Sequence, residues 1–273
     1  MKGAAAGGPA AGVFFVVLGL QLWLVAVAGT DIPFHDQWNI EGEWLYPQFK
    51  VGGLGFIDLL HPLNEHRITW THAWNLLLFQ LNGQWDPMVQ LVANAIPRAA
   101  TAGAFVWWLT PVIGRWRSAV LVAFAFLPHL GWHNVLWGNQ SQVYFAVALS
   151  GATLAWLSPP VRSNARTIGG LLAGSAALLA MGPAALVPVA LLGLGTMRAC
   201  AARRVGPDTW RECWPALVLL LLAVSLRVNV PEHHDLQPAS VAQALVAAGR
   251  LLAWPHEPIA AGVMVLPLAA LVV

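Results

Sequence analysis

Charged residues are scarce in this chain. Only 10% of its 273 residues are Asp, Glu, Lys or Arg, whereas 58% are hydrophobic. A soluble domain carries about 25% charged residues, so the shortage argues against an ordinary water-soluble protein. The apolar residues form repeated runs of roughly 15 to 25 residues, which match the thickness of a bilayer core. We therefore predict an all-α, polytopic transmembrane helix bundle.

Cysteine is almost absent as well. Cys200 and Cys213 are the only two, and both flank a basic segment that we expect in the cytoplasm, where disulfides are rare. The sequence also lacks a Walker loop, a dinucleotide fingerprint and a nucleophile elbow. His233 and His234 are adjacent in a proline-bounded loop, and adjacent histidines rarely bind one metal ion together. We predict no cofactor, no metal and no nucleic-acid partner.

The few charges predict which loops face the cytoplasm. Cytoplasmic loops of membrane proteins are enriched in Lys and Arg. Acids outnumber bases between residues 31 and 67, so this loop is expected outside, and the N-terminus inside. Every histidine then falls on the external side. The arginines expected in the cytoplasm are Arg115, Arg117, Arg162, Arg166, Arg198, Arg203, Arg204 and Arg211.

The segment 68–81 decides the topology. It is apolar on one side only and short for a span, so we expect it along the external interface, within an external loop of residues 30–83 that contains short helices. Residues 168–197 are too long for one span and carry Gly182 and Pro183 at their middle, which predicts a helical hairpin. The predicted spans are residues 13–27, 88–109, 120–130, 143–157, the two arms of 168–197, and 214–226.

A final apolar run begins at residue 259 and reaches Val273 before it attains the length of an ordinary span. We therefore expect residues 1–273 to form a single transmembrane domain that is the N-terminal part of a longer chain.

The first of three external polar stretches, residues 33–44, follows the N-terminal helix. Asp36 lies there between a histidine and a tryptophan. A carboxylate beside a membrane surface can accept a proton from an acceptor hydroxyl, which makes Asp36 the candidate catalytic base. The alternative is an interfacial acid beside a tryptophan anchor, and this alternative is favoured for Glu41 and Glu43.

The second stretch, residues 61–67, contains Glu65, His66 and Arg67. The three residues offer a base, a ring nitrogen and a fixed cation. The planar guanidinium of Arg67 suits a phosphate group, so these residues are candidates for binding a phosphorylated carrier. The alternative is an arginine that reaches the interface with its charged end and pairs with Glu65.

The third stretch, residues 129–142, precedes the apolar run 143–157. Its tryptophan ring, Trp137, can stack on the apolar face of a sugar, and its carboxamides can hydrogen-bond sugar hydroxyls. We therefore name Trp137, Asn139, Gln140 and Gln142 as candidate sugar-binding residues. The alternative is interfacial anchoring combined with helix capping by Asn139 or Ser141.

Together the three stretches resemble bacterial membrane proteins of the GT-C glycosyltransferase superfamily, relatives of the protein mannosyltransferases and aminoarabinose transferases. The likeness is closer to a group of bacterial membrane proteins with an Asn-Glu-His-Arg stretch, as in residues 64–67, and a Trp-Gly-Phe-Gln-x-Gln stretch. Here Asn139 replaces the phenylalanine of the second motif. The likeness covers roughly residues 10–200.

The resemblance implies transfer of a sugar from a polyprenyl-phosphate carrier to an acceptor on the periplasmic face of a bacterial inner membrane. Asp36 matches the first-loop acid of the family, and Arg67 matches a phosphate-binding cation. The expected partners are the lipid-linked sugar donor and membrane lipids. Two alternatives stay open: a transporter or flippase for a lipid-linked saccharide, and a non-catalytic scaffold of a polysaccharide assembly system.

Overall fold

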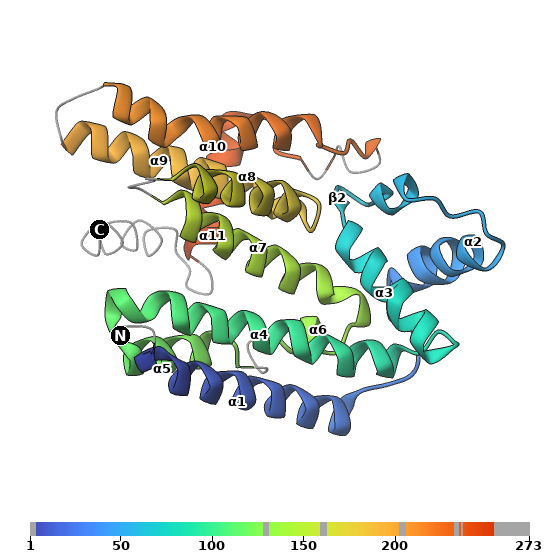
Figure 1. Cartoon of the computed structure of the whole chain (residues 1–273). Helices are drawn as coiled ribbons and strands as arrows, with labels where there is room; N and C mark the ends of the chain where they lie inside the picture. Colours follow the sequence, from blue (N-terminus) through green and yellow to red (C-terminus); the bar gives the residue numbers. More distant parts are fainter. Residues whose placement is uncertain are drawn as a thin grey trace. The chain divides into compact units, whose positions relative to one another are not determined.

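The computed structural model describes residues 4–127, 131–158, 163–201, 206–231, 235 and 237–253. It divides into two compact units, Met1–Val228 and Asn229–Val273. Apart from one short strand pair, the regular structure in the described residues is helical, which confirms the all-α prediction (Figure 1). The helix described in the second unit is α11 (Val241–Ala253).

The first unit alternates long helices with short connecting elements. In chain order its elements are α1 (Ala4–Ala28), η1 (Trp38–Leu45), α2 (Tyr46–Lys50), η2 (Ile57–Leu60), β1 (Pro62–Leu63), β2 (His66–Arg67), α3 (Thr69–Asn82), α4 (Pro87–Ile113), α5 (Arg115–Ala125), α6 (Trp132–Val135), η4 (Gly138–Gln140), α7 (Ser141–Leu157), α8 (Asn164–Leu178), η5 (Gly182–Ala185), α9 (Leu186–Ala201) and α10 (Pro207–Ser225).

The long helices form two packed groups. Helix α4 packs against α1 and α5, while α7, α8, α9 and α10 form the second group, and α4 also contacts α7. The chain runs back and forth between two ends of this bundle (Figure 1). We call the end that holds residues 29–86, 131–140 and 179–185 the polar end. The opposite end, where α4 meets α5 and α9 leads into α10, is the arginine end.

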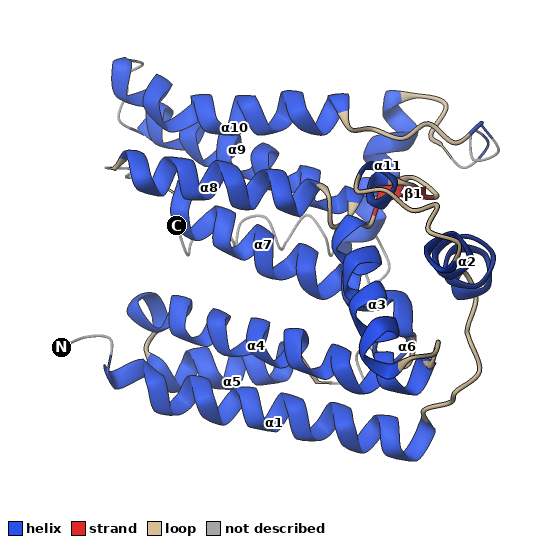
Figure 2. Cartoon of the chain, turned by 45° about the vertical axis from the view of Figure 1, so that its right-hand side comes forward, coloured by secondary structure: helices blue, strands red, loops and turns tan. Residues whose placement is uncertain are grey.

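Helix α3 lies across the polar end rather than along the bundle, and both cartoon views show this direction (Figures 1 and 2). It buries Thr71, His72 and Asn75 and exposes Leu77 and Leu81, so its polar face is turned inward. The segment 68–81 was predicted to lie along the external interface of a membrane, and this stays a prediction; the structure shows that α3 crosses the ends of the long helices (Figures 1 and 2).

Local sequence explains where the helices begin and end. The side chain of Asp86 accepts a hydrogen bond from the backbone amide of Val89, and Pro87 occupies the first turn of α4, as helix starts favour. Gly83 and Gly114 adopt positive φ angles of 75° and 85° directly after α3 and α4. The predicted hairpin within residues 168–197 is confirmed, because α8 ends at Leu178 and η5 starts the return.

Among the described residues, two helical stretches are long and apolar enough to cross a membrane, Gly7–Ala28 and Gly182–Ala201, so the polytopic bundle stays a prediction. The first has a mean hydropathy of 2.3, yet only 22% of its most apolar window is buried. The core helix of a soluble protein would be mostly buried, so this exposed apolar surface is compatible with membrane association.

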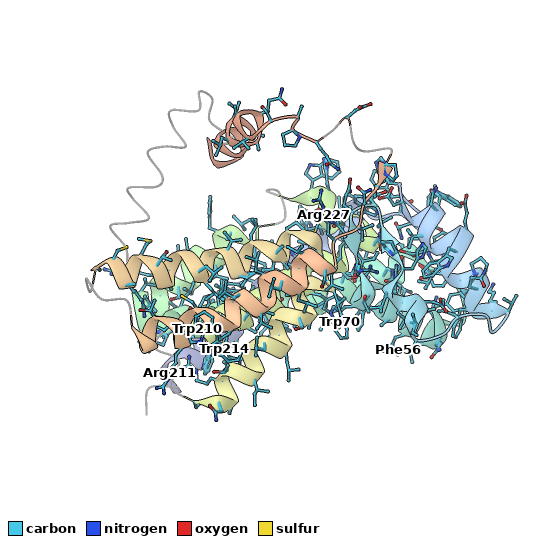
Figure 3. All side chains as sticks on the ribbon, turned by 90° about the horizontal axis from the view of Figure 1, so that it is seen from above. Phe56, Trp70, Trp210, Arg211, Trp214 and Arg227 are labelled. Carbon is cyan, nitrogen blue, oxygen red and sulfur yellow. The ribbon has the colours of Figure 1, made fainter. Side chains whose placement is uncertain are left out.

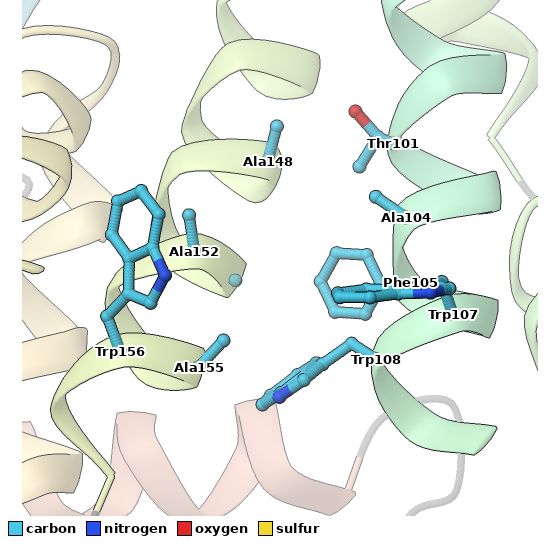
Figure 4. A pocket seen from close by; sticks show the side chains of 10 residues that line it. Thr101, Ala104, Phe105, Trp107, Trp108, Ala148, Ala152, Ala155 and Trp156 are labelled. Atoms are coloured by element: carbon cyan, nitrogen blue, oxygen red, sulfur yellow. The ribbon is translucent and has the colours of Figure 1, made fainter. Parts of the chain in front are cut away.

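An apolar pocket of about 210 Å³ separates α4 from α7 (Figure 4). The rings of Phe105, Trp108 and Trp156 line it beside small alanines. Its one hydroxyl, on Thr101, donates to the backbone carbonyl of Pro97 within α4. Its other hydrogen-bonding groups are the indole N–H groups of its tryptophans, so the pocket offers an apolar shape without an acid or a base.

Candidate functional site

The first and third polar stretches meet at the polar end. The ring of Trp137 lies 5.9 Å from that of Phe34 and 5.5 Å from that of His35, measured between centroids. Gly138 packs so closely here that a β-carbon on it would lie 2.6 Å from Gln90 Oε1 and 2.8 Å from Gln37 Nε2. Only glycine fits this position without moving the two carboxamides.

Beneath this contact lies a wholly buried carboxyl group, Glu41. Its Oε1 accepts a hydrogen bond from Asn75 Nδ2 at 3.0 Å. Its Oε2 accepts from Gln90 Nε2 at 2.7 Å and from the Tyr46 hydroxyl at 3.3 Å. Gln37 Nε2 donates to Gln90 Oε1 at 2.8 Å and extends the network toward Gly138. Elements η1, α2, α3 and α4 thus converge on one acid.

Burial raises the pKa of Glu41 to about 7, because the charged form is removed from water. The hydrogen bonds from Gln90 and Tyr46 act in the opposite direction, since they stabilise the carboxylate. Burial and the negative charge of Glu41 also raise the pKa of the Tyr46 hydroxyl, which keeps this group protonated as a donor. A carboxyl group with a pKa near neutral can exchange a proton at physiological pH.

A separate set of hydrogen bonds ties the third stretch to α3 and α4. Asn94 Nδ2 donates to the Gly138 carbonyl at 2.7 Å, and Trp74 Nε1 donates to Asn94 Oδ1 at 3.0 Å. Ser141 donates to the Thr71 hydroxyl at 2.9 Å and so joins the start of α7 to α3.

Several buried carboxamide atoms in the third stretch find no hydrogen-bond partner among the described residues. They are Asn139 Nδ2 and Oδ1, Gln140 Oε1 and Gln142 Oε1. Buried polar groups are almost always paired, so such a cluster indicates a place for water or a polar ligand. The capping alternative is not seen, because Gln140 precedes α7 without a side-chain cap bond and Ser141 bonds Thr71 instead.

The second stretch forms a small antiparallel pair in which Pro62 faces Arg67 and Leu63 faces His66. Asn64, between the strands, has a positive φ of 50°, which asparagine tolerates better than most residues. The pair packs against η5, since a β-carbon on Gly182 would lie 2.7 Å from His66 Nδ1. Arg67 Nη1 donates to the Leu60 carbonyl at 2.6 Å.

His72 links η2, which precedes the second stretch, to the first stretch. Its Nδ1 lies 3.1 Å from the Leu59 carbonyl, and its ring lies 5.2 Å from that of Trp44. Burial lowers the pKa of His72 to about 4, so the ring is neutral near pH 7. A neutral ring must donate from Nδ1 to the carbonyl, which leaves the buried Nε2 as an acceptor.

The structure therefore brings the predicted site residues together only in part. Asp36 is half-buried between His35 and the buried Gln37, beside the third stretch, and its carboxylate makes no hydrogen bond to the described residues. Of the sugar-binding candidates, Trp137 lies against the same loop. Glu65 and Arg67, in contrast, line a groove formed with α8, α9 and α10. His129 and the His233–His234 pair fall outside the described residues.

Glu41 was not predicted as a site residue, because the interfacial alternative was favoured for this acid. The polar stripe on α4 was not predicted either; it is formed by Gln90, Asn94, Arg98 and Thr101, all of them buried. These residues recur every three or four positions within an apolar run, which places them on one helix face. That spacing could have shown that α4 turns a polar face inward.

Arg98 lies in a second buried cluster, deeper in the bundle. Its guanidinium donates to the carbonyl of Phe126, which follows the last residue of α5, and at 3.4 Å to Gln21 Oε1. A cation at a helix C-terminus meets carbonyl groups that have no partner within the helix. This arrangement supplies the partners for Arg98 that the sequence alone did not reveal.

The described residues contain no group of three or more His, Cys, Asp or Glu side chains that could hold a metal ion. The chemistry on offer at the polar end is that of a buried carboxyl group, carboxamides, aromatic rings and one nearby arginine. Comparisons with protein-family models, with curated proteins and with solved structures each found no match.

Proposed function

We propose that the first unit is a polytopic membrane protein in which α1, α4, α5, α7, α8, α9 and α10 cross the bilayer. Its surface and interior support this, since apolar side chains face outward and polar ones inward. Phe15 of α1 is 66% exposed and Leu172 of α8 is 68% exposed, whereas Gln21 and Gln90 are buried. Such a pattern suits lipid rather than water, because intramembrane polar groups face the bundle interior.

The distribution of charge supports the same proposal. The arginine end carries Arg115, Arg117, Arg166, Arg198 and Arg211, all exposed. The polar end carries most of the acids, including Asp36, Glu41 and Glu65. By the positive-inside rule the arginine end faces the cytoplasm and the polar end faces outward, in a bacterium toward the periplasm.

We propose further that the polar end transfers a sugar from a polyprenyl-phosphate carrier to an acceptor. The observation that carries this proposal is the meeting of two stretches about a hundred residues apart, in which Trp137 and Gly138 pack against His35 and Gln37. The contact joins the loop that carries the half-buried Asp36 to the stretch that carries Trp137 and the unpaired carboxamide atoms. Those groups are suited to hold an uncharged polyhydroxyl ligand and to accept a proton from a hydroxyl.

In this proposal Asp36 accepts the proton of the acceptor hydroxyl as that oxygen attacks the anomeric carbon. The bond between the anomeric carbon and the carrier phosphate breaks, and the carrier phosphate leaves with the bonding electrons. Trp137, Asn139, Gln140 and Gln142 hold the sugar. Glu65, His66 and Arg67 lie toward the carrier phosphate. Glu41 holds Gln90 and Asn75 in place and thereby positions η1 beneath the sugar.

The test is a transfer assay with purified protein in lipid, supplied with polyprenyl-phosphate sugars and candidate acceptors. Asp36→Asn keeps the size of the side chain and removes its basicity, so transfer should fall about 100-fold or more. Asp58→Asn, in the same loop but beside Gly55, serves as the matched control and should retain activity. Full transfer by the Asp36 variant would remove this residue from the mechanism. Saccharide movement without bond cleavage would favour a transporter, and neither activity would favour a scaffold.

A further inference from the structure

A second site opens where the polar end meets the apolar flank of α9 and α10. It is a groove of about 350 Å³. Glu65 and Arg67 lie at one side of it, Leu186 and Val189 of α9 at another, and the last turns of α10 complete it. None of the residues assigned to sugar binding lines this groove.

Two cations face the groove from different parts of the chain. Arg67 uses Nη1 to bond the Leu60 carbonyl, while its buried Nε has no hydrogen-bond partner among the described residues. Arg227 follows α10 and is exposed. Figure 3 shows Arg227 at the opposite end of α10 from Arg211. With Glu65 counted, the mouth carries one net positive charge.

Below this mouth the lining is apolar and open. Leu186 is 69% exposed, Val224 is 67% exposed and Val189 is 52% exposed. Leu220 and Val224 of α10 and Arg227 just beyond its end follow one another at helical spacing, so the lining passes from apolar side chains to a cation. A ligand that is complementary to this lining has a hydrocarbon chain and an anionic head group.

We infer that this groove binds the phosphate end and the first part of the chain of a polyprenyl monophosphate lipid. Arg227 and Arg67 pair with the phosphate oxygens, and α9 and α10 cover the hydrocarbon. A phosphate monoester carries about 1.5 to 2 negative charges near pH 7. A phosphate monoester also offers three terminal acceptor oxygens, so both guanidinium groups can bond the same phosphate group, whereas a phosphodiester lipid has only two such oxygens. The inference rests on the proposed function for its choice of a polyprenyl chain, although the groove's chemistry stands without it.

Binding is measured on the full chain in nanodiscs of neutral lipid, with polyprenyl monophosphate, polyprenol, phosphatidylglycerol and inorganic phosphate as separate ligands. We expect the monophosphate to bind at least about tenfold more tightly than polyprenol, because charge-assisted hydrogen bonds are added. Arg227→Gln should weaken the monophosphate about tenfold and leave polyprenol unchanged. Arg227→Lys should keep most of the affinity, and Arg211→Gln, on the far end of α10, should keep all of it.

Filling the groove tests the hydrocarbon contact separately. Ala223→Trp should weaken both the monophosphate and polyprenol, since both need the channel between the helices. Equal binding of monophosphate and polyprenol, or an unchanged Arg227→Gln variant, would overturn the inference. Phosphatidylglycerol binding as tightly as the monophosphate would also overturn it, as would inorganic phosphate that binds equally well.

This measurement separates the two proposals. If the monophosphate binds through Arg227 but no sugar is transferred, the groove stands and the transferase proposal fails. If sugar is transferred while Arg227→Gln changes neither binding nor transfer, the transferase proposal stands and the groove does not hold the carrier.

Discussion

The two ends of the helix bundle use polar residues in opposite ways. At the polar end Glu41, Gln37 and Gln90 are buried and bonded to one another. At the arginine end Arg115, Arg117 and the other described arginines, Arg166, Arg198 and Arg211, are exposed. Arg166, for example, donates to a single backbone carbonyl, that of Ala155. A buried, interlinked group is sensitive to any change of its partners, whereas an exposed charge acts mainly through its sign.

The largest expected effect is the removal of Glu41, because it breaks the polar end at its centre. Glu41→Ala leaves Asn75 Nδ2 and the Tyr46 hydroxyl without an acceptor, removes one of the two acceptors of Gln90 Nε2, and opens a cavity. Each buried donor left unpaired costs about 1 to 3 kcal/mol, so we expect a loss of about 4 kcal/mol in the free energy of unfolding.

Denaturant unfolding of the purified protein measures this loss. The matched control is Glu43→Ala, which removes an exposed carboxylate two residues further along η1 and should change stability little. Glu41→Gln should lie between the two, because an amide keeps the shape of the side chain. The unpaired Oδ1 of Asn75 could then accept from the new amide if the Asn75 side chain turned over. Equal stability of the Glu41 and Glu43 alanine variants would contradict the central role of Glu41.

The next effect concerns pH. The pKa of Glu41 is about 7 in the folded protein and 4.5 as the reference value, so the unfolded chain gives up this proton first. The contribution of Glu41 to the free energy of unfolding is full below pH 4.5. About 3 kcal/mol of it is lost as the pH rises from 4.5 through 7. His72 behaves in the opposite way: its folded pKa of about 4 lies below 6.5, so its contribution is lost as pH falls from 6.5 through 4.

Thermal unfolding between pH 4 and 8 separates the two groups. Between pH 4.5 and 6.5 the wild-type profile should be nearly flat, since the contributions oppose each other. Glu41→Gln should become more stable as pH rises from 4 to 6.5, and His72→Gln should become less stable as pH rises from 4.5 to 7. His133→Gln, at an exposed position, should keep the wild-type profile. Parallel profiles for the Glu41 and His72 variants would show that one of the two assigned pKa directions is wrong.

The contrast between the two ends also explains how far the sequence could lead. Helix positions, the hairpin around Gly182 and the sorting of arginines to one end follow from local runs and counts of charge. The burial of Glu41 does not, because it depends on Asn75 and Gln90, which lie 34 and 49 residues away along the chain. Asp36 and Glu41 look alike as loop acids in the sequence, and only their packing distinguishes them.

For Arg67, in the second stretch, the sequence likewise predicted the chemistry of the side chain but not its surroundings. Its suitability for phosphate could be predicted from the guanidinium alone. Its position beside α9 and α10 could not, because it depends on the packing of residues 62–67 against Gly182. The contribution of Arg227 likewise requires the end of α10 to lie near a strand pair about 160 residues earlier.

The smallest expected effect lies at the arginine end and completes the comparison. Arg117 is exposed, and its guanidinium makes no hydrogen bond or ion pair to the described residues. Arg117→Gln should therefore change the free energy of unfolding by less than about 0.5 kcal/mol. If this end faces the cytoplasm, the combined change of Arg115 and Arg117 to Gln should still increase the fraction of chains inserted in the wrong orientation. Labelling of single cysteines placed at Ser163 and at Asn39 measures that fraction in whole cells. Unchanged labelling together with a large loss of stability would show that these arginines hold the fold rather than orient it.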